Sequence, residues 1–189
     1  MARGGTSSTE EQADTVDPSE PIPAESALLS YGGLKLGMSS AELSQVYNAP
    51  EGRGKDFDRI IAPYDAVAQH FITFDAKPGE PQRRLIAAFY RDKLYWIVDR
   101  REGLSAAQAK AWYDECVKAY GPPLRESVPG AQWSWEQAGG VKLTFTQDNA
   151  SETAMNANVV LVHQPTQTAA HDYLAKWEEA HPQEGKPAE

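Results

Sequence analysis

The sequence predicts an α+β domain: two α-β-β-β repeats that form one antiparallel sheet with helices on one face, followed by a C-terminal helix. The first observation behind this prediction is a helix-initiating motif that occurs twice, at Ser39 and at Ser105. The second is that each predicted helix precedes three segments rich in β-branched and aromatic residues. The third is size, since 189 residues with 41% hydrophobic content suffice for one domain of this kind.

Composition sets the boundaries of the predicted domain. Residues 1–27 are rich in Ser, Thr, Glu, Asp and Pro, which favours a disordered tether because few apolar side chains are available for burial. We expect a globular domain over residues 31–180, with repeats at about 34–101 and 102–163. Residues 181–189 form a short polar tail.

The first repeat opens with a turn, a short strand and a second turn over residues 32–37. A helix is expected after Ser39, because Ser39 and Glu42 have the spacing of a capping box, in which each side chain bonds the backbone N–H of the other residue. Asn48-Ala49-Pro50 is expected to end this helix, since proline disfavours the helical conformation of the preceding residue. One face of the helix is apolar and carries Leu43, Val46 and Tyr47.

Three strands are expected to follow the first helix. A polar loop over Glu51–Asp65 leads to the first strand, Gln69–Asp75. After a break at Lys77-Pro78-Gly79-Glu80-Pro81, Arg84–Tyr90 and Leu94–Asp99 are apolar and aromatic runs separated by three polar residues. These two runs predict an antiparallel hairpin.

The second repeat restarts the same pattern 66 residues later. Ser105 and Gln108 have the spacing of a second capping box, and Gly121-Pro122-Pro123 is expected to end a longer helix. Apolar residues fall at helical spacing along one side of this helix, at Ala109, Trp112, Tyr113, Cys116, Val117 and Tyr120.

Three more strands and a last helix complete the predicted fold. The strands are expected at Gln132–Glu136, Val141–Thr146 and Asn158–His163, and the middle one alternates cleanly between apolar and polar residues. A final amphipathic helix is expected over Thr168–Ala180. Its apolar residues are Tyr173, Leu174 and Trp177.

The order of these motifs resembles a known family. In the first copy, the relevant residues run from Leu36-Gly37-Met38-Ser39 to Ala49-Pro50, and in the second from Gly103-Leu104-Ser105 to Gly121-Pro122. Each copy resembles the SmpA/OmlA domain of the outer-membrane assembly lipoprotein BamE, and the tandem arrangement is similar to the BLIP (β-lactamase inhibitory protein) fold. The resemblance implies a non-catalytic, protein-binding module of the bacterial cell envelope.

Three features depart from that family pattern. No lipobox cysteine precedes the tether, Cys116 has no second cysteine with which to form a disulfide, and the second helix is longer than the first. These departures weaken what the resemblance implies about a lipid anchor and about any particular partner of the family.

The net charge of −9 is concentrated at the two ends of the chain. Residues 1–30 hold six acids and one base, whereas residues 31–177 hold 17 acids and 16 bases. A nearly neutral body has no field that would attract a phosphate backbone, which argues against nucleic acid as a partner.

One segment of the body is locally basic and has two open interpretations. It holds two acids, Asp92 and Asp99, against six bases, which are Arg83, Arg84, Arg91, Lys93, Arg100 and Arg101. These bases are either solvated strand ends that protect a sheet edge or a patch for an acidic partner or anionic lipid headgroups.

More than one cellular compartment is compatible with the sequence. No apolar run approaches the roughly 20 residues that a membrane-spanning helix needs. No signal peptide is visible in the chain as written, so cytoplasmic is the default expectation. If a leader or lipobox has been removed, residues 1–27 would serve as a membrane tether, and the protein would be periplasmic or an outer-membrane lipoprotein.

The sequence predicts no catalytic residue, metal site or cofactor. The four histidines, at 70, 163, 171 and 181, have no metal-ligand spacing, although His70 and His163 could meet if their strands were adjacent. Cys116 lies on an apolar helical stripe, which is typical of a buried thiol. Phosphate-binding and serine-nucleophile motifs are absent from the sequence.

Six residues are candidates for binding another protein. Trp133 and Trp135 project from the same side of a predicted strand, either into the core beneath the helices or onto an open face. On an open face they would form an aromatic platform with Tyr90 or Tyr95, and aromatic side chains are common at binding hot spots. The basic candidates are Arg91 and Lys93.

The predicted function is a non-catalytic protein-binding or structural module, associated with the cell envelope. The repeated scaffold, the tether and the lack of a catalytic motif favour this interpretation. The alternative is a small-ligand-binding protein or an enzyme, which would require a pocket with converging polar groups between the helices and the sheet.

Overall fold

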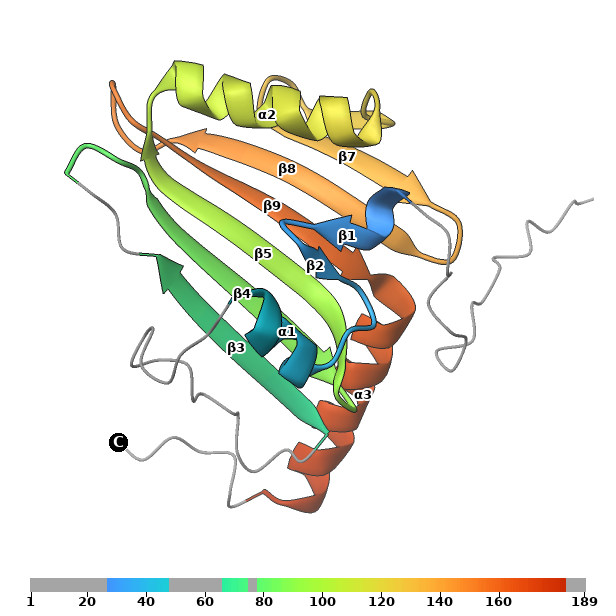
Figure 1. Cartoon of the computed structure of the whole chain (residues 1–189). Coiled ribbons are helices and arrows are strands. Elements are labelled where there is room, and N and C mark those ends of the chain that lie inside the picture. The colour runs from blue at the N-terminus through green and yellow to red at the C-terminus, as the bar shows by residue number, and fades with distance from the viewer. Residues whose placement is uncertain (1–26, 48–65, 75–77, 183–189) are drawn as a thin grey trace, which may run out of the picture.

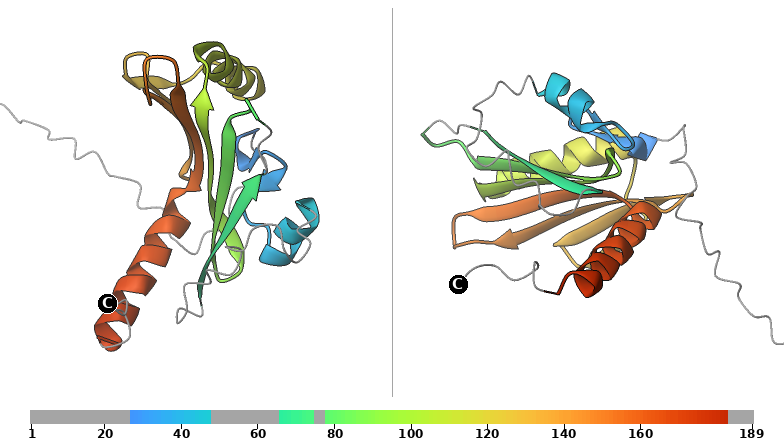
Figure 2. Two further views of the ribbon diagram at one scale, coloured as in Figure 1. Left: turned by 90° about the vertical axis from the view of Figure 1, so that its left-hand side faces the viewer. Right: turned by 90° about the horizontal axis from the view of Figure 1, so that it is seen from below.

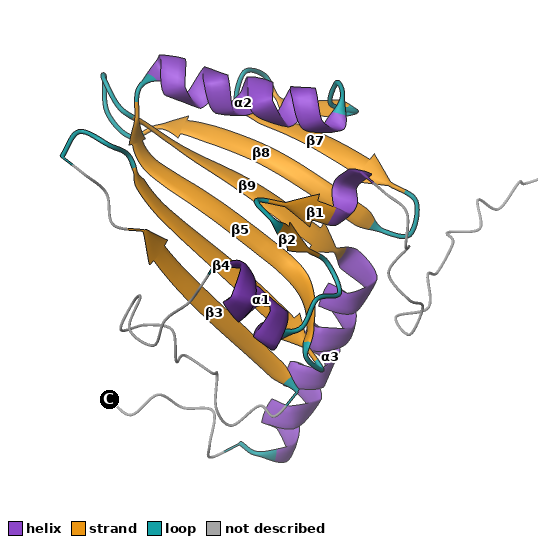
Figure 3. Ribbon diagram, viewed as in Figure 1, coloured by secondary structure: helices purple, strands orange, loops and turns teal. Residues whose placement is uncertain are grey.

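The computed structural model describes residues 27–47, 66–74 and 78–182, and within them it confirms an α+β fold. Three α-helices pack on one seven-stranded antiparallel sheet (Figure 1, Figure 3). The predicted loop at Glu51–Asp65, the end of the first helix at Pro50, the tether before residue 27 and the tail after residue 182 lie outside the described residues.

The sheet has the order β3-β4-β5-β9-β8-β7-β6, and all of its neighbouring strands are antiparallel. Its strands are β3 (Val67–Phe74), β4 (Gln82–Tyr90), β5 (Lys93–Leu104), β6 (Arg125–Val128), β7 (Gln132–Gln137), β8 (Val141–Asn149) and β9 (Met155–His163). The strands after the first helix therefore form one half of the sheet, and those after the second helix form the other. The last strands of the two halves, β5 and β9, pair at the centre.

Both predicted capping boxes are present at the starts of their helices. α1 (Ser40–Val46) is capped by Ser39 and Glu42, and α2 (Ala106–Tyr120) is capped by Ser105 and Gln108. In each box the serine side chain accepts from the backbone N–H three residues later, which satisfies one of the free donors at a helix start.

One face of the sheet, here called the covered face, packs against α1 and α2 (Figure 2). Between these helices lies a small separate hairpin of β1 (Ser30–Tyr31) and β2 (Leu34–Lys35), preceded by the 3-10 helix Ala27–Leu29 (Figure 1). The main core fills this layer. Its most deeply buried side chains include Phe89 and Phe145 from the sheet and Leu34 and Leu43 from the covering segments.

The opposite face, here called the open face, carries α3 (Gln164–Ala180) at one end (Figure 2). Ala170 of α3 is fully buried against a second, smaller cluster that includes Val67, Ala88 and Tyr95. Gly140 allows the start of α3 to approach the β7–β8 turn, because a Cβ there would lie 2.7 Å from Cδ of Pro165.

Several elements extend beyond their predicted bounds. β3, β4 and β9 begin two or three residues earlier than predicted, and β8 ends three residues later. α3 begins at Gln164 rather than Thr168, with a proline in its first turn.

Two larger differences concern β6 and β5. β6 was not predicted, because its four residues are all exposed and follow no apolar alternation. β5 continues to Leu104, five residues beyond the predicted end at Asp99, because the charged residues after Asp99 pair with β9 along the ladder. The hydrogen bonds between paired strands are made by backbone groups, so a segment without apolar alternation can still pair.

Candidate functional site

The predicted tryptophan pair lies on the covered face beneath α2. Trp135 is 3% exposed, and its indole N–H donates to the Gly121 carbonyl at the end of α2 over 2.8 Å. The Trp133 ring lies 4.6 Å from the ring of Tyr113 on α2, measured between centroids. Both rings therefore belong to the core between the sheet and α2.

Tyr90 and Tyr95 lie in the cluster beneath α3, so the structure does not bring them together with the tryptophans. Tyr95 is 4% exposed, and the half-buried Tyr90 ring lies 6.0 Å from that of Tyr173 on α3. A single aromatic platform made of all four rings is not present, because the two pairs belong to clusters under different helices.

Arg91 and Lys93 are exposed at the tight turn between β4 and β5. Arg91 and Asp92 have φ values of 50° and 56°, as expected for a two-residue turn that matches the twist of its strands. Asp92 accepts from both the backbone N–H and the hydroxyl of Ser40, at 3.0 and 2.8 Å, which fastens the turn to α1. These hydrogen bonds hold the pKa of the Asp92 carboxyl below its usual value.

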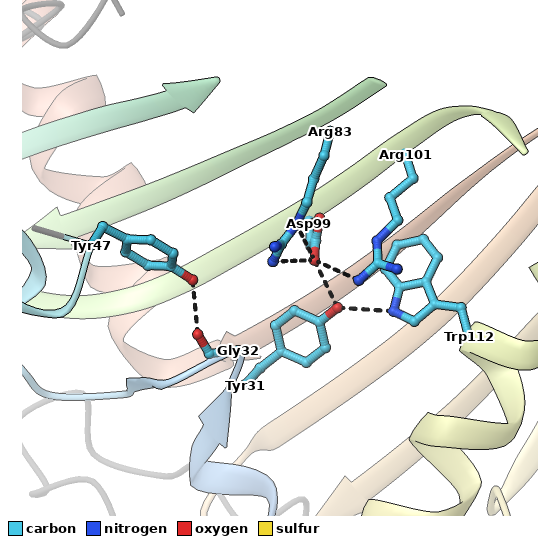
Figure 4. Close-up of polar contacts among 7 residues, drawn as sticks. All are labelled: Tyr31, Gly32, Tyr47, Arg83, Asp99, Arg101 and Trp112. Atoms are coloured by element: carbon cyan, nitrogen blue, oxygen red, sulfur yellow. Dashed lines mark hydrogen bonds and ion pairs between the residues drawn. The ribbon is translucent and has the colours of Figure 1, made fainter. Parts of the chain in front are cut away.

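The most concentrated polar cluster of the described residues lies on the covered face between α1 and α2 (Figure 4). Its centre is Asp99 on β5, whose side chain is fully buried. Arg83 on β4 donates to both carboxylate oxygens of Asp99 at 2.9–3.2 Å, and Arg101 lies 3.5 Å away. Tyr31 donates to the same carboxylate at 2.9 Å and accepts from the Trp112 indole at 3.1 Å.

The contacts around Asp99 keep Arg83 charged and Tyr31 neutral. Burial opposes the charge on Arg83, but the hydrogen bonds and charge of Asp99 raise the pKa of the guanidinium. Burial, aided by Asp99, raises the pKa of the Tyr31 hydroxyl far above its usual value. The Arg101 guanidinium stacks over the Trp112 ring at 3.9 Å, which adds a cation–π contact.

The cluster ties together segments that are far apart in the sequence. It joins the β1 hairpin through Tyr31, the sheet through Asp99 and Arg83, and α2 through Trp112. Tyr31 stays protonated at neutral pH, so it is unsuited to act as a general base. We assign this cluster a structural role in holding the covering elements to the sheet.

The structure also shows where the two strand histidines and the single cysteine lie. His70 and His163, which would meet only if their strands were adjacent, are separated, because β4 and β5 lie between β3, with His70, and β9, with His163. Burial raises the pKa of the Cys116 thiol to about 12, so it is a poor nucleophile. Within the part of the chain that the structure describes, no group of three or more His, Cys, Asp or Glu could hold a metal ion.

The open face beyond α3 carries an apolar row that runs across four neighbouring strands. Phe71 pairs with Ile86, Ile86 with Val98, and Val98 with Val160, so the four side chains stand side by side. All four are half-buried. No described helix other than α3 lies on this side of the sheet (Figure 2).

Two arginines lie directly opposite each other in the next row of the open face. Arg84 on β4 pairs in register with Arg100 on β5, and both are exposed. Arg100 forms an ion pair of 2.7 Å with Glu102 of its own strand, whereas Arg84 forms none with any described residue. Like charges placed directly opposite on a sheet are unfavourable, so this pair has no evident structural purpose.

Sequence reasoning grouped all the arginines between 83 and 101 into one basic segment and did not separate the two pairs. The signal was the alternation itself. Alternation along β5 places Arg101 on the same face as Asp99 and Arg100 on the other, and the pairing with β4 adds Arg83 to the first face and Arg84 to the second. Asp99 follows the apolar run Leu94–Val98 and precedes two arginines. A lone aspartate in such a position is itself a signal of a buried carboxylate that is paired with a base.

No family model, no curated protein and no solved structure matches this chain. No helix in the described ranges is both long and apolar enough to span a membrane. The case for function therefore depends on the geometry of the molecule.

Proposed function

We propose that this protein is a non-catalytic protein-binding module that binds its partner on the open face of the sheet. The observation that carries the proposal is the exposed arginine pair, Arg84 and Arg100, beside the apolar row on a face that α3 covers at one end. The partner expected from this chemistry is a protein surface that combines aliphatic side chains with carboxylates.

The apolar row supports the proposal through its shape and exposure. Phe71, Ile86, Val98 and Val160 span four strands and form one continuous strip rather than scattered single residues. Contiguous apolar strips bordered by polar residues are typical of interaction sites. A partner that covers this strip would bury surface that the fold itself leaves half exposed.

The arginines supply the expected charge preference. A carboxylate placed between Arg84 and Arg100 would offset the repulsion between the two guanidinium groups, and arginine is common at protein interfaces. The covered face shows the same solution within the fold, where the Asp99 carboxylate lies between Arg83 and Arg101.

The sequence also supports an internal repeat and a location in the cell envelope. We infer that the two halves are α-β-β-β repeats, which the symmetric order of β3-β4-β5 and β9-β8-β7 supports, with β6 as an addition to the second half. The BamE-like and BLIP-like pattern of the turns and caps, together with the composition of residues 1–27, is the support for a cell-envelope location.

A photo-cross-linking residue in place of Val98 tests the proposal in cells that make the full chain. The expected result is a discrete adduct with another protein that is lost on Arg84→Glu with Arg100→Glu. A cross-linker in place of Lys118, an exposed residue on α2 on the other face, should not form the same adduct.

The test depends on whether the adduct requires Arg84 and Arg100. An adduct that survives charge reversal of both arginines, or that forms equally from Lys118, would refute the proposed site. For the captured protein, purified, we expect the double charge reversal to weaken binding about tenfold or more. The matched control is Lys118→Glu, which should leave the affinity unchanged.

A further inference from the structure

The two edges of the sheet differ sharply in how well they are protected against pairing with another strand. β6 forms one edge, and its four residues include Arg125 and Glu126 and precede Pro129. Short length, charge and proline are the features by which proteins block edge-to-edge pairing. The β6 edge is therefore protected.

β3 forms the other edge and has none of these features. Its eight residues, Val67–Phe74, contain no Asp, Glu, Lys, Arg or Pro, and every one of them pairs with β4 on the inner side. No described strand pairs with its outer side. The backbone N–H and C=O groups that point away from β4 are strong hydrogen-bonding groups suited to another strand.

We propose that β3 pairs with β3 of a second copy of this chain, so that two sheets join into one continuous antiparallel sheet. This dimer does not depend on the proposed function, because it can form whether or not the open face binds another protein. Antiparallel pairing of identical strands is two-fold symmetric, so one contact pairs the outer sides of both β3 strands and closes the assembly as a dimer.

The apolar row fixes the register of the contact. Phe71 is the last residue of that row and lies on the outermost strand. With Phe71 of one copy directly opposite Phe71 of the other, the row continues across the seam, with four apolar side chains from each copy. Aromatic pairs in such directly opposite positions are favourable.

The charge of the domain permits this approach of two copies. Residues 31–177 hold 17 acids and 16 bases, so this part of the chain carries little net charge to repel a second copy. In the proposed register, Gln69 lies opposite Thr73 of the second copy, and both belong to the open face together with Phe71. Gln69 and Thr73 therefore provide a charge test of the contact.

The test measures the mass of the full chain by sedimentation over a range of protein concentrations. The natural sequence should form a dimer as concentration rises. Gln69→Glu with Thr73→Glu places carboxylates opposite each other twice, and we expect the dissociation constant of the dimer to rise about tenfold. Gln69→Lys with Thr73→Glu places opposite charges in the same two positions and should restore the dimer.

The two double variants share Thr73→Glu, so they differ only in the sign of the charge at residue 69. A matched control, Ser127→Glu with Val128→Glu, adds the same charge to the β6 edge and should leave the dimer intact. Thermal unfolding of each variant shows whether it is folded. Slower amide exchange in β3 at high protein concentration provides a readout of the natural chain alone.

Three outcomes would overturn this inference. One is a natural chain that stays monomeric at every concentration. Another is a dimer that is equally strong in both double variants. The third is a dimer that is weakened by Ser127→Glu with Val128→Glu rather than by the carboxylates on β3.

Discussion

Two pairs of arginines on the same two strands show how the faces of this sheet differ. Arg83 and Arg101 are directly opposite on the covered face, and their neighbours in the sequence, Arg84 and Arg100, are directly opposite on the open face. On the covered face the buried carboxylate of Asp99 lies between the guanidinium groups. On the open face both arginines are exposed to solvent.

Arginine therefore takes part in a buried ion-pair cluster on one face of the sheet and lies at the solvent-exposed surface on the other. Beneath the helices, a charge survives burial only when it is paired and hydrogen-bonded. On the open face, water screens the charges of both arginines; Arg100 is ion-paired with Glu102, and Arg84 forms no ion pair with a described residue. Substitutions on the covered face should therefore affect folding, and those on the open face should affect association.

The largest expected effect comes from Asp99→Asn. This change leaves two partly buried guanidinium groups without their carboxylate, and we expect the free energy of unfolding to fall by about 3 kcal/mol. Arg84→Ala, on the open face, should change it by about 0.5 kcal/mol at most, since that side chain is exposed. Urea unfolding of both variants checks the comparison, which fails if the two effects are equal.

A smaller difference in stability between the two faces is expected at two neighbouring valines of β9. Val159 is fully buried on the covered face, whereas Val160 is half-buried on the open face. We expect Val159→Ala to lower the free energy of unfolding by about 2 kcal/mol and Val160→Ala by less than about 1 kcal/mol. A Val160→Ala cost equal to that of Val159→Ala would show that the open face is packed as tightly as the covered one.

The smallest expected effect is a pH dependence at the junction between the sheet and α3. His163 is 2% exposed, and its Nδ1 lies 2.7 Å from the Thr166 hydroxyl. Burial lowers its pKa below the ordinary 6.5, although a hydrogen bond with the Gly139 backbone opposes this. The unfolded chain therefore binds a proton more readily than the folded chain, and stability should fall as the pH drops below about 6.5.

Chemical unfolding at pH 7.5 and pH 5 provides the measurement for His163. His163→Gln should show a smaller loss of stability between these two pH values than the natural chain. The control is His171→Gln, because His171 is exposed on α3 and should leave the loss unchanged. If His163→Gln and the natural chain lose the same stability, His163 does not cause the pH dependence.

Local features of the fold could be predicted because each depends on neighbouring residues. The capping boxes at Ser39 and Ser105 need only a side chain three residues away, and the alternation of Val141, Leu143 and Phe145 follows from the geometry of one strand. β6 could not be predicted, because it exists only through its pairing with β7.

The candidate binding residues could be predicted only in part, because exposure depends on which face the helices cover. Trp133 and Trp135 were expected either in the core or on an open platform, and the position of α2 places them in the core. Tyr90 and Tyr95 could not be assigned a face from alternation alone, since an irregularity in the β4–β5 ladder lies beside them. Arg91 and Lys93 were expected between two strands; both are exposed, Arg91 in the turn and Lys93 as the first residue of β5.

The sequence by itself determined where the two capped helices begin, which strands alternate and which segments are apolar, because these properties depend on residues a few positions apart. Only the tertiary structure decided what lies on each face. Tyr31 and Asp99 are 68 residues apart, and their hydrogen bond exists because the β1 hairpin folds over β5. The separation of the two arginine pairs into a buried cluster and an exposed surface likewise follows from which face of the sheet the helices cover.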